Sequence, residues 1–70
     1  MSQDVRCKLS KNVKYYRNKL GLSCEELSLQ LNLDNSYISK LERGKINITL
    51  DKLDQLAVVL NISIEQLFSD

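Results

Sequence analysis

The 70-residue chain has no histidine and no proline, only two glycines and two cysteines, and no long hydrophobic run. Because Cys7 and Cys24 are the sole soft ligands, a zinc site lacks donors, and one disulfide would be an odd framework for a secreted mini-protein. We therefore expect reduced thiols, no metal and no cofactor. No segment has the length of a membrane span, and the N-terminus has no apolar run of signal-peptide type. A cytoplasmic protein with no membrane partner is expected.

The groups that catalysis needs are missing as well. The sequence has no nucleophile paired with a base, no glycine-rich phosphate loop and no cluster of metal ligands. We therefore do not expect an enzyme. Cys24 has two interpretations, a spectator residue or a redox-sensing thiol, because a helix N-terminus can lower a thiol pKa.

The residues that are present favour one compact all-α domain over residues 1–70. Hydrophobic residues make up 43 % of the chain, and the absence of proline suits helices. Two apolar stripes recur at helical spacing: Leu9, Val13, Tyr16 and Leu20, and then Leu50, Leu53, Leu56, Ala57 and Leu60. We predict helices over 8–20, 24–31, 35–43, 50–60 and a short last one ending at residue 68, after a flexible arm over 1–7.

The helix ends carry recognisable capping residues. Two capping boxes are predicted, Ser23 with Glu26 and Ser63 with Gln66. Asp34 and Thr49 are predicted single caps for the third and fourth helices.

Residues 24–43 contain two short helical patterns on either side of a compact turn. Leu27 and Leu31 form the inward side of the first, and Ile38 and Leu41 form that of the second. Asn32 is the best non-glycine candidate for a left-handed turn residue, and a small residue at position 28 leaves room for steeply crossing helices. This is the layout of a helix-turn-helix, whose second helix presents its polar face to the DNA major groove.

The outward side of that second helix lacks the paired glutamates and lysines of an ordinary surface helix. The predicted base-reading residues are Asn35, Ser36, Tyr37 and Lys40. Asparagine suits adenine, and lysine suits the N7 and O6 acceptors of guanine. For Tyr37 a second interpretation is a ring that covers the crevice between the two helices.

The charges are distributed unevenly, although the net charge is only +1. Residues 1–19 carry six basic side chains against one acidic one, and the balance reverses from residue 51 onward. A basic face opposite a neutral-to-acidic face suits a DNA-binding molecule. An ordinary solvated mixture of charges is the alternative.

Several segments together resemble the Cro/C1-type (XRE-type) helix-turn-helix family of regulators. They are Gly21-Leu22-Ser23, Glu26-Leu27, Tyr37-Ile38-Ser39 and Leu41-Glu42-Arg43-Gly44. The resemblance covers about residues 9–68 and implies a five-helix fold of the lambda-repressor-like type. It also implies a homodimer that binds double-stranded DNA at a pseudo-palindromic operator. The short length and the Asn47-Ile48-Thr49 segment look like the controller proteins of restriction–modification systems.

The resemblance also suggests roles for residues around the two helices. Arg17 and Glu42 look like the family's interhelical ion pair, the alternative being two solvated charges. The predicted phosphate contacts are Ser23, Cys24, Ser39, Arg43, Lys45 and Asn47. Many family members have glutamine in place of Cys24, and that glutamine side chain commonly contacts a phosphate. Because cysteine is a poor replacement, we assign the contact at Cys24 to the backbone amides of the helix N-terminus.

A second copy of the chain is the expected protein partner, because one recognition helix presents too few base-reading side chains for specificity. The predicted interface residues are Ile48, Val59, Ile64, Leu67 and Phe68. RNA polymerase is left open as a further partner, as is the choice between activation and repression. An antitoxin or another protein-interaction module of the same fold is the competing function.

Overall fold

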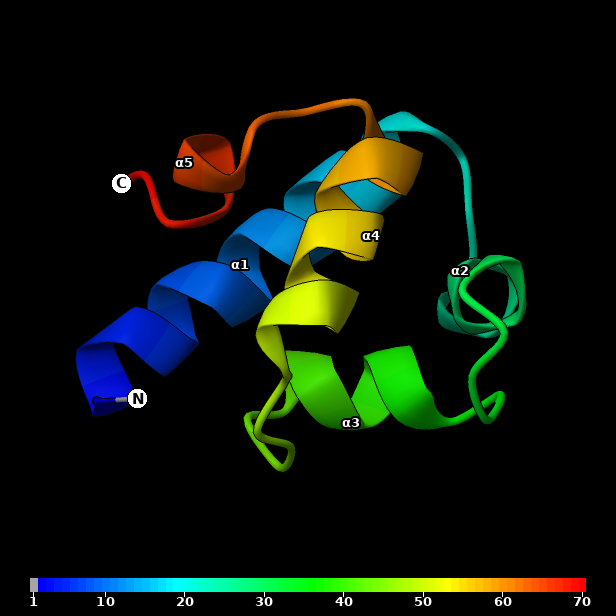
Figure 1. Cartoon of the computed structure of the whole chain (residues 1–70), viewed down its shortest axis with the longest axis horizontal. Coiled ribbons are helices and arrows are strands. Elements are labelled where there is room, and N and C mark those ends of the chain that lie inside the picture. Colours follow the sequence, from blue (N-terminus) through cyan, green and yellow to red (C-terminus); the bar gives the residue numbers. More distant parts are fainter. Residues whose placement is uncertain (1) are drawn as a thin grey trace.

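A computed structural model describes residues 2–70 and contains five helices and no strand within that range. They are α1 (Gln3–Lys19), α2 (Cys24–Gln30), α3 (Tyr37–Glu42), α4 (Leu50–Leu60) and α5 (Ile64–Leu67). In Figure 1, α3 lies along the base of the molecule, α4 rises above it, and α1 crosses behind α4. The α3 helix packs against both α2 and α1, and α5 packs against α1 and α4. The predicted all-α, five-helix class is confirmed.

One hydrophobic core joins all five helices. Its buried members are Leu9, Val13, Leu27, Leu31, Ile38, Leu41, Leu53, Leu56, Ala57, Leu60 and Leu67. Two predicted core residues are wrong, since Leu20 is 50 % exposed and Leu50 is 82 % exposed. Leu20 is the C-cap residue of α1 and lies beyond its last full turn, and Leu50 is the first residue of α4. Helical spacing alone does not show whether a residue at the end of a helix is still covered by the core.

The predicted flexible arm over 1–7 is wrong for residues 3–7, which form the first turns of α1. The Ser2 hydroxyl accepts a hydrogen bond from the Val5 N–H at 3.2 Å and so caps the helix. Asp4 lies in the first turn, where a negative charge suits the helix dipole. Position 1 lies outside the described residues.

The two asparagine turns have the left-handed backbone that their side chains tolerate. Asn32 has φ 57° and Asn61 has φ 59°. After Asn32 the chain reverses, and the Leu33 N–H donates to the Ser28 carbonyl at 3.0 Å. The predicted turn residue of the helix-turn-helix is therefore confirmed.

The start of α3 differs from the expected Asp34 cap. Both predicted capping boxes and the Thr49 cap are present, but the N-cap residue of α3 is Ser36, whose side chain caps nothing. The buried Ser28 of α2 takes this role: its hydroxyl accepts from the Ile38 N–H at 3.0 Å and donates to the Cys24 carbonyl at 2.8 Å. Asp34 instead accepts from the Ser36 hydroxyl at 2.7 Å. The α3 helix is thus capped by its neighbour.

Candidate nucleic-acid interface

The α3 helix, only six residues long, has sharply different sides. Ile38 and Leu41 are 0 % and 2 % exposed and form its inner side. The four predicted base-reading residues form what we call the recognition face: Asn35, Ser36, Tyr37 and Lys40. Asn35 and Lys40 are exposed, and Ser36 and Tyr37 are half-buried. Asn35 and Ser36 precede the helix, so the face combines the turn with the first turns of α3.

Tyr37 lies partly against the hydrophobic core and partly at the surface. Its ring packs against the hydrophobic core, and this burial raises the pKa of its hydroxyl. The second interpretation of Tyr37, a ring that covers the crevice, therefore fits its position at least in part. Asn35 and Lys40 are the two members of the recognition face with exposed side chains.

The structure brings Arg17 and Glu42 together in a bidentate ion pair. Arg17 Nε donates to Glu42 Oε2 at 2.8 Å, and Nη2 donates to Oε1 at 3.1 Å. Both side chains are 11 % exposed, so they are not two solvated charges. The pKa of Arg17 is raised, chiefly by the hydrogen bond to Glu42. Arg17 Nη1 also donates to the Leu22 carbonyl at 2.8 Å. The pair ties the end of α3 to α1 and to the segment before α2.

The loop after α3 carries three exposed polar side chains, Arg43, Lys45 and Asn47. The Arg43 guanidinium donates to the Ser39 carbonyl at 3.3 Å, and the Lys45 N–H donates to the Lys40 carbonyl at 2.9 Å. These bonds hold the loop against the last turn of α3. The predicted phosphate contacts of this loop therefore lie next to the recognition face.

Two more predicted phosphate residues, Cys24 and Ser39, lie near a lysine that sequence reasoning missed. Cys24, Ser39 and Arg43 line an open hollow of about 400 Å³ together with Lys14 and Glu42. Lys14 lies in the basic run of α1 three residues before Arg17, and this spacing places both on one side of the helix. This spacing is the feature of the sequence that could have indicated Lys14.

The predicted phosphate contact at Ser23 is already engaged in its own helix cap. The Ser23 hydroxyl accepts from the Glu26 N–H at 3.0 Å, and the Ser23 N–H donates to the Glu26 carboxylate at 2.8 Å. These bonds hold the pKa of Glu26 below its usual value. The capping box uses the Ser23 N–H and one acceptor site of its hydroxyl, which leaves the hydroxyl hydrogen as the group that can donate to a phosphate.

Cys7 and Cys24 are both free. Burial raises the pKa of the Cys24 thiol, which is opposite to the lowered pKa of a redox-sensing cysteine and favours the spectator interpretation. Within residues 2–70, no group of three or more histidine, cysteine or acidic residues is placed to hold a metal ion. In the same range, no helix has both the length and the apolar character of a membrane span.

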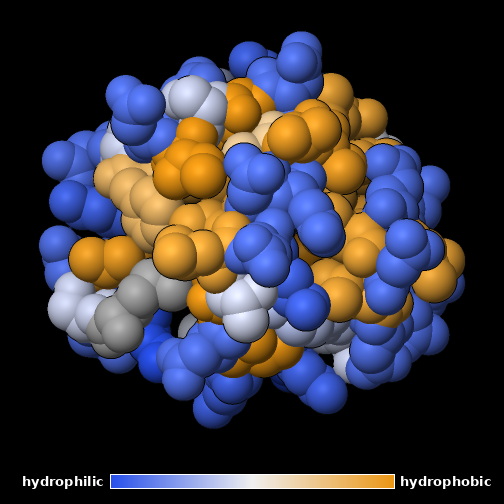
Figure 2. All heavy atoms as spheres, viewed as in Figure 1, coloured by the Kyte–Doolittle hydropathy of each residue, from blue (hydrophilic) through white to orange (hydrophobic). Residues whose placement is uncertain are grey.

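A second surface, which we call the apolar groove, lies between α1, α4 and α5. It has a volume of about 640 Å³ and is lined by Val5, Lys8, Ile48, Leu50, Leu53, Ile64 and Phe68. Figure 2 shows apolar side chains gathered over this part of the surface. Three of the predicted interface residues, Ile48, Ile64 and Phe68, therefore meet in one place.

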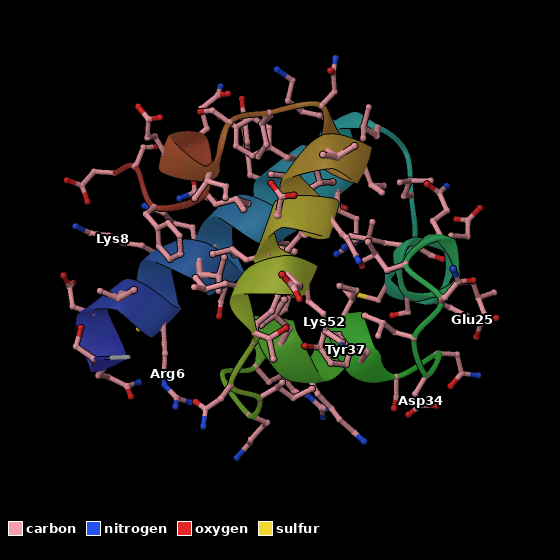
Figure 3. The ribbon with its side chains drawn as sticks, viewed as in Figure 1. Arg6, Lys8, Glu25, Asp34, Tyr37 and Lys52 are labelled. Carbon is pink, nitrogen blue, oxygen red and sulfur yellow. The ribbon has the colours of Figure 1, made fainter. Side chains whose placement is uncertain are left out.

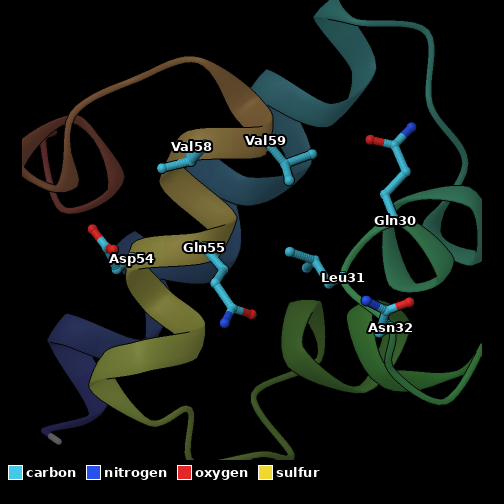
Figure 4. A pocket seen from close by; sticks show the side chains of 7 residues that line it. All are labelled: Gln30, Leu31, Asn32, Asp54, Gln55, Val58 and Val59. Atoms are coloured by element: carbon cyan, nitrogen blue, oxygen red, sulfur yellow. The ribbon is translucent and has the colours of Figure 1, made fainter.

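Two predicted interface residues lie elsewhere. Leu67 is fully buried in the core of the single chain, so its side chain is not available to a partner. Val59 lines a different hollow of about 300 Å³ between the end of α2 and α4, where it lies beside Val58 and across from Leu31 and Asn32 (Figure 4). The hydrophobic pattern marked both as apolar, but only the packing shows which side of α4 and α5 each one occupies.

Comparison with known proteins agrees with this architecture. The helix-turn-helix family model HTH_3 matches residues 13–67. A hypothetical transcription factor from Neisseria meningitidis is 38 % identical over 65 residues, which cover 93 % of this chain and 61 % of that protein. The chain thus spans less than two thirds of that relative. The control protein C.MunI from a Mycoplasma species is 35 % identical over 68 residues, covering 96 % of this chain and 92 % of the relative.

A solved structure shows the same fold. The restriction–modification controller protein C.AhdI from Aeromonas hydrophila superposes with a TM-score of 0.82 at 35 % identity, covering 90 % of this chain and 96 % of the other. Taken with the family match over residues 13–67, it shows that the chain belongs to the helix-turn-helix family of DNA-binding transcriptional regulators.

Proposed function

We propose that this protein is a transcriptional regulator that acts in the cytoplasm as a homodimer on a pseudo-palindromic operator in double-stranded DNA. One observation carries the proposal. The recognition face is exposed and polar, while the opposite side of the same short helix is buried and its end is locked by the Arg17–Glu42 pair. A rigidly held polar helix face is what the major groove accepts.

The two kinds of DNA contact are assigned by side-chain chemistry. Asn35 and Lys40 read base edges, because they are exposed and carry groups that match adenine and guanine. Ser36 and Tyr37 contribute their hydroxyls at the edge of the same face. Phosphate contacts come from Ser23, Ser39, Arg43, Lys45 and Asn47, from the backbone at Cys24, and from Lys14. These contacts set the register of the protein on the duplex.

The proposed homodimer is supported by the apolar groove. Leu50 is 82 % exposed and Ile64 is 38 % exposed beside it, an arrangement that a folded monomer does not need. A second copy that packs its own groove on this one covers the same residues twice, as a twofold interface requires. Two recognition helices about 34 Å apart would then match one turn of the duplex.

The relatives support a proposal for the regulated genes. Matches to proteins named as control or controller proteins cover most of this chain and most of those proteins. We therefore propose that the chain regulates a restriction–modification operon, including its own gene. RNA polymerase is a further proposed partner if the protein activates as well as represses.

A gel-shift assay with the DNA upstream of the protein's own gene tests the proposal. We expect a discrete complex with that DNA and affinity that falls steeply as salt rises, because phosphate contacts release counterions. Random duplex of the same length is the control. Equal affinity for both duplexes would contradict the proposal and favour a protein-interaction module such as an antitoxin.

A further inference from the structure

Arg6 links α1 to the loop that follows α3. Its Nη2 donates to Asn47 Oδ1, and its Nη1 donates to the Gly44 carbonyl at 3.4 Å. Figure 3 shows Arg6 reaching from α1 toward this loop. These bonds join residues 38 and 41 positions apart, and they come from a segment that the sequence alone predicts to be a flexible arm.

The contact decides which way the Asn47 amide faces. An asparagine side chain has one acceptor oxygen and two N–H donors on nitrogen. Because Arg6 occupies the oxygen, the Nδ2 donors are directed away from α1. Asn47 is exposed, and it shares its loop with Arg43 and Lys45. A phosphate accepts hydrogen bonds and offers none, so an amide oriented in this way suits it.

The geometry also calls for arginine in particular. A guanidinium presents its donors in a rigid planar fork, which can bridge a carbonyl and an amide oxygen together. A lysine ammonium keeps the charge but is a point donor on a flexible stem. Within residues 2–70, Arg6 forms no ion pair with a carboxylate, so its bonds to the loop are its structural contacts.

We propose that Arg6 is a positioning residue for DNA binding: it holds the Gly44–Asn47 loop and turns the Asn47 amide donors toward a backbone phosphate. The proposal rests on the proposed DNA-binding function. Arg6 acts through Asn47 and is not itself a base-reading residue.

The test is a set of affinity measurements by fluorescence anisotropy on the upstream DNA, over a range of salt concentrations. The variants are Arg6→Lys, Asn47→Ala and the double variant. We expect Arg6→Lys to weaken binding roughly two- to tenfold, the range that one net hydrogen bond spans. Asn47→Ala should weaken it by a similar factor, and the double variant should be no weaker than Asn47→Ala. The salt dependence should not change, because Arg6→Lys conserves the charge.

Lys11→Arg is the matched control, because it is also a charge-conserving change on α1 but lies beside the C-terminal residue, whose carbonyl accepts from Lys11 Nζ at 3.5 Å. It should bind as the unmodified protein does. A urea titration of Arg6→Lys at the assay temperature checks that the variant is folded.

Three outcomes separate the possibilities. If Arg6→Lys binds like the unmodified protein, Arg6 acts only by its charge and the proposal is wrong. If the two single effects multiply in the double variant, Arg6 does not act through Asn47, and the proposal is again wrong. If the unmodified protein shows no preference for the upstream DNA, the proposed function itself fails.

Discussion

The recognition face and the apolar groove expose opposite kinds of side chain on one five-helix frame. The recognition face presents amide, hydroxyl and ammonium groups, which can form hydrogen bonds with water where they are exposed. The groove presents leucine, isoleucine and valine side chains, whose exposure to water costs free energy. The first surface is therefore stable without a partner, and the second is stabilised only when something covers it.

Both surfaces are attached to α1 by buried polar groups. On one side, Arg17 holds the end of α3 through Glu42. On the other, the buried Asn12 Nδ2 donates to the Leu67 carbonyl at 2.9 Å and to the Ser69 carbonyl at 2.7 Å, which holds the end of α5. The α1 helix is thus the common support, and each surface can be disturbed separately.

The largest expected effect is on the support of the recognition face. Arg17→Ala leaves Glu42 buried without its partner and should lower the free energy of unfolding by about 3–5 kcal/mol. Urea denaturation measures this. Lys14→Ala, an exposed change one turn earlier, is the control and should stay within about 0.5 kcal/mol. A loss below about 1 kcal/mol for Arg17→Ala would mean that the pair behaves like a surface salt bridge.

Changing Leu50 should disrupt the groove and leave the recognition face intact. Leu50→Ser removes apolar burial of about 1.5–3 kcal/mol from each copy of the proposed dimer, so dimerisation should weaken strongly. Sedimentation equilibrium measures the dimer. Val58→Ser is the matched control, since Val58 is 71 % exposed on the same helix but outside the groove. If both variants dimerise equally well, the groove is not the interface.

Changing Ser28 tests whether the cap at the start of α3 depends on one hydroxyl of α2. Ser28→Ala leaves the Ile38 N–H buried without an acceptor and should destabilise the protein by about 1–3 kcal/mol. Thermal and urea unfolding measure the change, and Ser39→Ala at a half-buried position of α3 is the control. An unchanged stability would show that α3 finds another cap.

Changing Lys40 tests whether its side chain reads a base or contacts a phosphate. Lys40→Ala should relax discrimination at one base position of the operator by about 1–3 kcal/mol. Binding to a set of single-base operator variants measures this. If the variant instead binds all sequences more weakly by the same factor, Lys40 contacts a phosphate.

The smallest expected effect is on the pH dependence of stability, which should differ between the two capping boxes. The pKa of Glu26 is lowered in the folded protein by hydrogen bonds from Ser23, so its contribution to stability is present above the unfolded pKa of about 4.5. That contribution is lost as the pH falls through the lower folded pKa. Glu26→Gln keeps a capping box and should flatten the acid side of the stability curve.

The box at the other end of the molecule supplies the control for this pH effect. The α5 box has Gln66 at the equivalent position and therefore does not titrate. Gln66→Glu should introduce a new loss of stability in acid. Identical acid profiles for all three proteins would contradict the assigned role of Glu26.

Much of this molecule follows from local rules that a sequence displays directly. A capping box needs only two residues three apart, and a left-handed turn needs only a residue that tolerates it, so Ser23, Glu26 and Asn32 were predictable. Helical spacing placed Leu27, Ile38 and Leu56 in the core for the same reason. The four members of the recognition face were predicted because the outward side of this helix carries short hydrogen-bonding side chains, an aromatic ring and a lysine in place of paired glutamates and lysines.

The tertiary structure decided whatever depends on groups that are distant along the chain. Ser28 rather than Asp34 caps α3, because the steep crossing of α2 and α3 brings the Ser28 hydroxyl to the Ile38 N–H. Residues 3–7 are helical and bound to the loop after α3, because Arg6 finds its acceptors about 40 residues away. Leu67 and Leu50 have equal hydrophobicity, yet one is in the core and the other is on the surface. The sequence by itself determined most of the helical segments and which side chains carry groups that match base edges. How those helices pack decided which of these side chains are exposed, because burial depends on all five helices together.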